Sequence, residues 1–293
     1  MFGWMILAVM FIAAVFGLIR SAYERNCLTV SEYTVCSEKL SPEFDGKTLV
    51  FLADLHNKSF GEKNVRLLET IRGMNPDMVL IGGDTMVAKG QMNCPLEVTA
   101  ELISALAKKY PVYYGYGNHE LRLKTLPVYE EIHRTFLQTL RAAGVRILDD
   151  CSVSFRGEKG SLTISGLTLT KETYHRFKKQ PLESGYIEKR IGRVPEDDMR
   201  ILLAHNPLYF EEYARWGADL TLSGHYHGGT IILPILGGVM SPDYHLFPRR
   251  YRGRYESEGK TMVLSGGLGT HSINIRFGNK PELTVIRLQC KSR

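Results

Sequence analysis

Short apolar runs that end abruptly in Asp, His or Asn are the feature that most constrains the fold of this chain. Residues 48–53 read Thr-Leu-Val-Phe-Leu-Ala and are followed at once by Asp54 and His56, and residues 78–81 are followed by two glycines and Asp84. Short continuous apolar runs of this kind are typical of strands that are buried on both faces of a sheet. The chain is therefore predicted to build a buried sheet whose strands carry polar residues at their carboxyl ends.

Amphipathic segments alternate with these runs in the first half of the chain, in the order βαβαβα. Such alternation requires a sheet covered by helices, with ligands bound at the carboxyl ends of the strands. After Gly144, short strand-like segments separated by glycines predict a second, antiparallel sheet that also takes the later strands. The polar segment 171–198 fits either a lid or insertion, or a plain solvated segment. The predicted strands are 48–53, 78–81, 112–114, 146–148, 152–155, 162–164, 200–204, 219–222, 261–264 and 283–286, and the predicted helices are 62–74, 96–110 and 127–143.

The polar residues at the strand ends form a set that suits metal ions. Carboxylates, an amide oxygen and several imidazoles give the mixed oxygen and nitrogen ligation preferred by manganese, iron, zinc or magnesium. In an extended Asp-x-His or His-x-His segment both side chains point to the same side, so two metals can share the set. Two metals about 3.5 to 4 Å apart activate a water and bind the oxygens of a phosphoryl group. The set is Asp54, His56, Asp84, Asn118, His119, His205, His225 and His227.

The N-terminal segment is a candidate membrane anchor. Residues 1–19 contain no charged side chain, and a helix of that length can cross a hydrocarbon core about 30 Å thick. A cleaved signal peptide or a buried N-terminal helix are the alternatives. Arg20 and Arg25 flank only the C-terminal end, which favours a cytoplasmic location for the rest of the chain, whereas a disulfide between Cys27 and Cys36 would favour the opposite side. The chain divides accordingly into an anchor (1–20), a connecting segment with a first strand (21–47) and a main domain (48–293).

Composition narrows the class of protein. The 293 residues are 44% hydrophobic and 23% charged, which is typical of a folded domain and excludes an intrinsically disordered chain. The formal charge of +6 permits an anionic substrate or membrane surface and does not imply nucleic acid. The five cysteines include no Cys-x-x-Cys pair, so neither a disulfide framework nor a zinc ribbon is expected. The basic run 249–254 is either a solvated loop or a contact for phosphate or anionic lipid.

The order of the polar motifs resembles that of the calcineurin-like metallophosphoesterases. The resemblance covers roughly residues 49–288 and implies a four-layer α/β/β/α sandwich, preceded here by one transmembrane helix. It also implies an enzyme that hydrolyses phosphoester or pyrophosphate bonds with two divalent metal ions. The motifs are Asp54-Leu55-His56, Gly82-Gly83-Asp84, Gly117-Asn118-His119-Glu120, His205 before Asn206-Pro207, and Gly224-His225-Tyr226-His227.

The resemblance implies a role for each residue of the set. His119 would be the acid that protonates the leaving oxygen or stabilises the transferring phosphoryl group. Asp84 would bridge the two ions, with manganese expected first and iron, zinc or magnesium as alternatives. One ion would be bound by Asp54, His56 and His227, and the other by Asn118, His205 and His225.

Two further segments resemble a membrane-associated branch of the family, with enzymes similar to UDP-2,3-diacylglucosamine pyrophosphatases. They are residues 227–234 and 276–283. The leading hypothesis is therefore a membrane-anchored hydrolase whose partners are the bilayer and a phosphorylated small molecule or lipid, such as a UDP-diacylglucosamine. The alternatives are a phosphodiesterase or nuclease, which would need a basic groove lined by aromatic side chains, and a non-catalytic membrane-tethered binding protein on the same fold. Outside the motifs, His271 is a candidate substrate contact, whereas His133, His175 and His245 are expected to be exposed.

Overall fold

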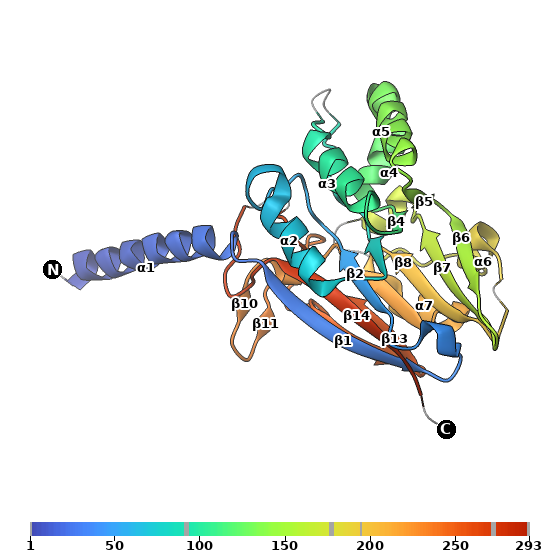
Figure 1. The fold of residues 1–293 in the computed structure, drawn as a ribbon. Coiled ribbons are helices and arrows are strands. Elements are labelled where there is room, and N and C mark those ends of the chain that lie inside the picture. Colours follow the sequence, from blue (N-terminus) through green and yellow to red (C-terminus); the bar gives the residue numbers. More distant parts are fainter. Residues whose placement is uncertain (1, 91–93, 176–178, 194, 271–273, 292–293) are drawn as a thin grey trace.

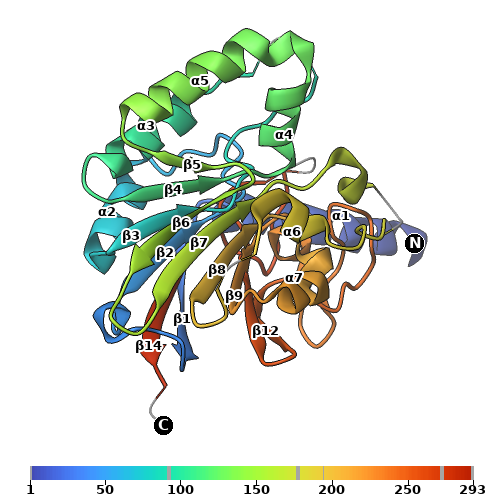
Figure 2. The same cartoon turned by 90° about the vertical axis from the view of Figure 1, so that its right-hand side faces the viewer.

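Two six-stranded sheets lie face to face, and helices cover the outer face of each (Figures 1 and 2). The computed structural model describes residues 2–90, 94–175, 179–193, 195–270 and 274–291. One apolar core fills the space between the sheets and includes Leu49, Phe51, Leu203 and Leu222. Separate apolar clusters lie under the helices on either side. The predicted four-layer α/β/β/α sandwich is confirmed.

The first sheet has the strand order β1-β14-β2-β3-β4-β5. Strands β2 to β5 run parallel, because helices connect them, whereas β14 pairs antiparallel with β2 and parallel with β1. All residues of β2, β3 and β4 are buried, as their continuous apolar sequences predict. The bounds are β1 Thr29–Ser37, β2 Thr48–Leu52, β3 Met78–Ile81, β4 Val112–Gly115, β5 Arg146–Leu148 and β14 Glu282–Cys290.

The second sheet differs from the prediction, because most of it is parallel. Its order is β12-β13-β9-β8-β7-β6, and only the two outer pairs, β12 with β13 and β6 with β7, are antiparallel. The predicted strands 146–148 and 283–286 belong to the first sheet instead. The pattern of a strand shows how it is buried and not which sheet it joins, so this assignment was wrong. The bounds are β6 Cys151–Arg156, β7 Ser161–Leu167, β8 Met199–Ala204, β9 Leu220–Ser223, β12 Gly253–Ser257 and β13 Lys260–Leu264.

The helices pack where the alternation of strands and helices predicts them. Helices α2, α3 and α5 cover the first sheet, and α6 and α7 cover the second (Figure 2). Segment 171–198 is not a plain solvated segment, because it includes α6, whose Ile187 packs in the outer core. Helix α4 was not predicted, since its sequence is polar and short. The bounds are α1 Phe2–Glu24, α2 Val65–Met74, α3 Glu97–Ala107, α4 Asn118–Thr125, α5 Glu130–Ala142, α6 Tyr186–Ile191 and α7 Phe210–Trp216. A small hairpin, β10 (Ile232–Leu233) and β11 (Gly237–Gly238), lies outside both sheets.

Helix α1 extends away from the sandwich (Figure 1). Its most apolar stretch has no buried residues, and its length and composition fit a membrane span or a signal sequence. Its last turn, however, is docked on the body. The Ser21 hydroxyl oxygen accepts a hydrogen bond from the Arg276 N–H (3.0 Å), and the Glu24 carboxylate accepts one from the Asn279 N–H (3.2 Å).

Candidate metal centre

The eight polar residues singled out in the sequence meet at one place, and all are buried. They follow the carboxyl ends of strands from both sheets: β2, β3 and β4 of the first, and β8 and β9 of the second. The two sheets therefore each supply part of the site. The residues are Asp54, His56, Asp84, Asn118, His119, His205, His225 and His227.

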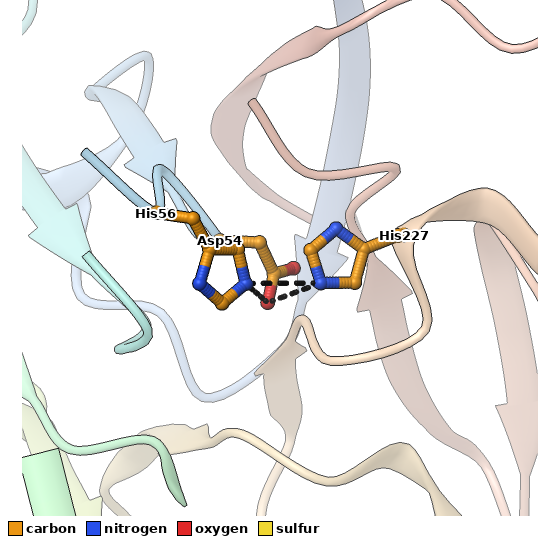
Figure 3. A group of neighbouring side chains, drawn as sticks. All are labelled: Asp54, His56 and His227. Atoms are coloured by element: carbon orange, nitrogen blue, oxygen red, sulfur yellow. Dashed lines mark hydrogen bonds and ion pairs between the residues drawn. The ribbon is translucent and has the colours of Figure 1, made fainter. Parts of the chain in front are cut away.

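One group of candidate ligands consists of Asp54, His56 and His227. Figure 3 shows their polar atoms pointing toward one another. The Nε2 atoms of the two histidines are 3.1 Å apart, and the Asp54 Oδ1 atom lies 3.6 Å from His227 Nε2 and 4.0 Å from His56 Nε2. Two imidazole nitrogens and a carboxylate oxygen in such a group match the ligands that divalent metals take in proteins.

The second group is built around Asp84. Its Oδ2 atom lies 3.2 Å from His205 Nε2 and 3.9 Å from His56 Nε2. The Asp54 Oδ1 atom also lies 3.6 Å from His205 Nε2, so the two groups adjoin each other. A ligand atom of His225 lies within 4.8 Å of those of Asp84 and His205. The Asn118 Oδ1 atom is buried without a hydrogen-bond partner in the described part of the chain, and a cation would satisfy this acceptor. The donor set therefore fits two divalent metal ions.

The backbone at these residues is left-handed. Asp54, His56, Asp84, His225 and His227 all have positive φ, between 47° and 72°. The expectation of an extended Asp-x-His segment was wrong, because β2 and β9 end before the ligands and tight turns aim the side chains. Each such residue costs on the order of 1 kcal/mol or more and persists when its surroundings impose it. The Asp54 carboxylate helps to impose it by accepting the His225 N–H (3.0 Å).

Burial and neighbouring charges shift the pKa values of the site residues in opposite directions. Burial lowers the pKa of His205, yet the carboxylates of Asp84 and Asp54 raise that pKa to about 10. Burial likewise raises the pKa of Asp84, but the neighbouring histidines hold it well below its usual value. For Asp54, burial prevails and raises the pKa to about 6. Because metal ligands must be deprotonated, metal binding here releases protons.

His119 lies beside the ligands and is held by the backbone. The Ala88 N–H donates to His119 Nδ1 (2.8 Å), and the Ala88 carbonyl lies 3.1 Å from the same nitrogen. The His119 N–H, at the start of α4, donates to Asp84 Oδ1 (2.8 Å). Burial lowers the pKa of His119, while the negative charge of Asp84 raises it in part. The ring meets His56 edge to face, with centroids 5.1 Å apart.

Glu120 was named in a motif but given no role, and the structure shows one. Its buried carboxylate accepts hydrogen bonds from the N–H groups of Asp84 (2.7 Å), Thr85 (3.0 Å) and Gly117 (2.9 Å). It also accepts from the Tyr114 hydroxyl (2.6 Å). These bonds fix the turn that carries Asp84 against the start of α4.

Two residues near the site were given no role in the sequence analysis. Asp243 Oδ1 lies 3.2 Å from His225 Nε2. Asn279 donates through Nδ2 to the His227 carbonyl (2.6 Å), and a side chain at Gly228 would collide with Asn279. Both act on histidines that the sequence identified. Only their positions in the fold reveal them, because they lie 18 and 52 positions away in the chain from the histidines that they contact.

The remaining predictions about single residues have mixed outcomes. His175 is exposed as expected, but His133 and His245 are half-buried. His271 lies outside the described residues. In the basic run, Arg250 pairs with Glu211 (2.5 Å) and Arg252 with Glu282 (2.9 Å). Much of that run therefore holds the domain together rather than being a plain solvated loop.

Comparison with known families decides the class of enzyme. The model for the calcineurin-like phosphoesterases matches residues 47–229. The chain belongs to this family. Members depend on two metal ions, and the present chain is a metallophosphoesterase with residues arranged to bind metal.

Relatives match along most of the chain. An uncharacterized metallophosphoesterase of Aquifex aeolicus is 28% identical over 96% of this chain and 99% of its own length. The uncharacterized metallophosphoesterase YkuE of Bacillus subtilis is 25% identical, over 91% of this chain and 87% of its own. The phosphodiesterase YaeI of Escherichia coli is 26% identical, over 82% of this chain and 81% of its own.

A first prediction follows from the hydrogen bonds that the Glu120 carboxylate accepts, which we call the Glu120 network. Glu120→Gln keeps the size of the side chain but turns one acceptor into a donor that faces other donors. We expect a loss of about 1 to 3 kcal/mol of stability and a lower metal content, measured by thermal unfolding and elemental analysis. Glu101→Gln, on the exposed side of α3, is the matched control. Unchanged melting and metal content in Glu120→Gln would show that the network does not hold the site.

Proposed function

We propose that this metallophosphoesterase is anchored in a membrane by α1 and hydrolyses a lipid-linked phosphate or pyrophosphate. One observation carries the proposal: the end of α1 is docked on residues 276–279, and this segment is hydrogen-bonded to the backbone of His227, a candidate metal ligand. Glu24 accepts from the Asn279 N–H, and the Asn279 side chain donates to the His227 carbonyl. A helix held this close to the site keeps the site near the bilayer surface. A substrate such as a UDP-diacylglucosamine, suggested by the sequence resemblance, would be presented there.

The proposed ligand sets follow the two groups of buried side chains. Asp54, His56 and His227 would hold one ion, Asn118, His205 and His225 the other, and Asp84 both. Two bound divalent ions, with manganese proposed first, supply Lewis acidity toward phosphoryl oxygens and an activated water.

Side chains beside the proposed ions would bind the substrate and supply a proton to its leaving group. His119, as the imidazolium, donates its Nε2 proton to the leaving oxygen and keeps the proton on Nδ1, which faces the Ala88 carbonyl at 3.1 Å. Arg122 lines the same cavity of about 40 Å³ as Asp84 and Asn118, so its guanidinium is available to phosphoryl oxygens. Tyr174 also lines the cavity and packs against His225, with ring centroids 5.2 Å apart.

Location and domain division are part of the same proposal. Residues 1–20 form a single-pass anchor, 21–47 form a connecting segment with the first strand, β1, and 48–293 form the metallophosphoesterase domain. Arg20 and Arg25 favour the cytoplasmic side for that domain. Hydrolysis of a soluble phosphodiester is the second candidate function, and the similarity to the phosphodiesterase YaeI supports it.

The test compares the full chain with a variant that lacks residues 1–19. The deletion stops before Arg20 because Ser21 and Glu24 are docked on the body. We expect hydrolysis of a small chromogenic phosphodiester to be unchanged, and hydrolysis of a UDP-diacylglucosamine in vesicles to fall. Equal activity of both proteins on the vesicle substrate, with the full chain in the soluble fraction of cells, would contradict the anchoring. Turnover of the soluble diester alone would favour the second candidate.

A further inference from the structure

The most exposed large apolar side chains outside α1 gather in one place. Ile235 and Leu236 lie at the turn between β10 and β11, and Leu246 and Phe247 lie in the following loop. Their exposed fractions range from 51% to 105%. Soluble surfaces rarely gather such side chains, and a group of them indicates a contact with a partner or a membrane.

These four residues belong to one small structural unit, which we call the hairpin platform (residues 231–240 and 244–247). The Val239 N–H donates to the Ile231 carbonyl (2.8 Å), and the Phe247 N–H donates to the Val239 carbonyl (2.9 Å). A β-bridge also joins Met240 and Leu246. The two exposed loops are therefore held together by backbone hydrogen bonds.

The hairpin platform is attached beside the base of α1. The Ile232 N–H donates to the Phe277 carbonyl (2.8 Å), and the guanidinium carbon of Arg20 lies 4.8 Å from the centre of the Phe277 ring. Figure 1 shows β10 and β11 next to the point where α1 leaves the sandwich. An apolar helix and an apolar hairpin thus share one side of the molecule.

Positive charges lie beside the end of α1, where the helix joins the body of the protein. Lys58 and Arg66 both donate to Asn26, just after α1, at 2.7 and 3.2 Å. Burial lowers the pKa of Lys58, and the nearby positive charges of Arg25 and Arg66 lower it further. Basic residues next to a membrane helix attract anionic headgroups. A two-fold contact between two copies would add a second set of the same cations, whereas an anionic bilayer supplies the opposite charge.

The hairpin platform also borders the metal centre. The Met240 N–H donates to the carbonyl of Gly229 (3.3 Å), two residues after His227. Pro242 and Asp243, which lie between the two parts of the platform, line the same cavity as Asp84 and Asn118. Any surface that the hairpin platform contacts therefore lies close to the cavity at the metal centre.

We infer that the hairpin platform is a second membrane contact, which inserts Ile235, Leu236, Leu246 and Phe247 into the headgroup region of an anionic bilayer. This inference rests on the proposed anchoring by α1 and adds to it. The anchor alone would let the domain swing about one helix. With the platform inserted, the cavity that contains Asp84 is held at the level of the headgroups, where the phosphate of an amphiphile lies.

Tryptophan quenching in the full chain tests the inference. The chain has two tryptophans, Trp4 in α1 and Trp216 in α7, so Trp4→Phe with Trp216→Phe gives a silent background. Leu236→Trp is added to this background as the platform probe. Val128→Trp, at an exposed apolar position, is the matched control. Val128 lies between α4 and α5 in the chain, and Figure 1 shows these two helices well away from α1. A third protein keeps Trp4 alone. Each is placed in nanodiscs that contain phosphatidylglycerol and brominated lipid.

We expect brominated lipid to quench the platform probe about as strongly as Trp4, and to leave the Val128→Trp control unaffected. Quenching of Trp4 without quenching of the platform probe would overturn the platform contact while leaving the anchor intact. If Trp4 itself is not quenched, the proposed anchoring fails, which is a separate result. Acrylamide then distinguishes the alternatives for an unquenched platform probe: access by acrylamide shows a bare platform, and shielding from it shows that a second copy or another protein covers the platform.

Discussion

Asp84→Asn is expected to lower phosphoesterase activity by at least about 10 to 100-fold, the loss seen when even an outer partner of a metal ligand is removed. Asp84 is the carboxylate proposed to bind both ions, with Oδ2 3.2 Å from His205 Nε2 and 3.9 Å from His56 Nε2. An amide of the same shape keeps the oxygen but removes the negative charge that would hold two cations together. Metal content, measured by elemental analysis, should fall along with activity.

The fold should survive this change. Asn can still accept the His119 N–H that Oδ1 accepts now, so circular dichroism and thermal unfolding should show a folded protein. Asp197→Asn, on the exposed surface, controls for loss of a carboxylate elsewhere. An Asp84→Asn protein with full activity and full metal content would rule out the bridging role.

His119→Ala is expected to cut turnover roughly 10² to 10⁴-fold, the scale of a general acid, and to leave metal content nearly intact. The loss should shrink for substrates with good leaving groups, because these need little protonation. The measurement is turnover across a series of aryl phosphodiesters of decreasing leaving-group pKa. His175→Ala, at an exposed position, is the matched control.

Two outcomes would assign His119 another role. An equal loss across all leaving groups would indicate that the imidazole binds the phosphoryl group rather than donating a proton. Loss of metal would indicate a ligand, which the geometry also allows, since His56, Asp84 and His119 have ligand atoms within 4.8 Å of one another.

The strand ends were predictable from the sequence because a buried strand has a clear signature. Residues 48–53 and 78–81 form β2 and β3, and Asp54 and Asp84 follow them as expected. Once both strands are parallel neighbours, their ends must lie together. The convergence of the eight polar residues is thus a consequence of alternation that the amino-acid pattern already contains.

The sheet membership of strands was not predictable, because it depends on contacts between distant segments. β14 inserts between β1 and β2, although it follows the second-sheet strands in the chain. The turns at the ligands were missed for a different reason. Positive φ at Asp54 or His225 is unfavourable locally and is imposed by long-range hydrogen bonds, such as the one from the His225 N–H to Asp54. Local propensity cannot indicate it.

Residues that support the ligands were missed for the same reason. Asn279 reaches the His227 carbonyl from 52 positions away, and Asp243 reaches His225 from a loop without any recognisable pattern. Glu120 was the exception, because its place next to Asn118 and His119 marked it. An acid directly after two candidate site residues, in the first turn of α4, is a signal that could have given it a role.

The arrangement of the metal ions is tested most directly by anomalous diffraction from crystals grown with Mn²⁺. We predict two peaks about 3.5 to 4 Å apart, one contacted by Asp54, His56 and His227, the other by Asn118, His205 and His225, with the Asp84 carboxylate between them. In crystals of protein that is active with Mn²⁺, a single peak would contradict the two-metal centre, and two peaks that Asp84 does not bridge would contradict the proposed ligand arrangement.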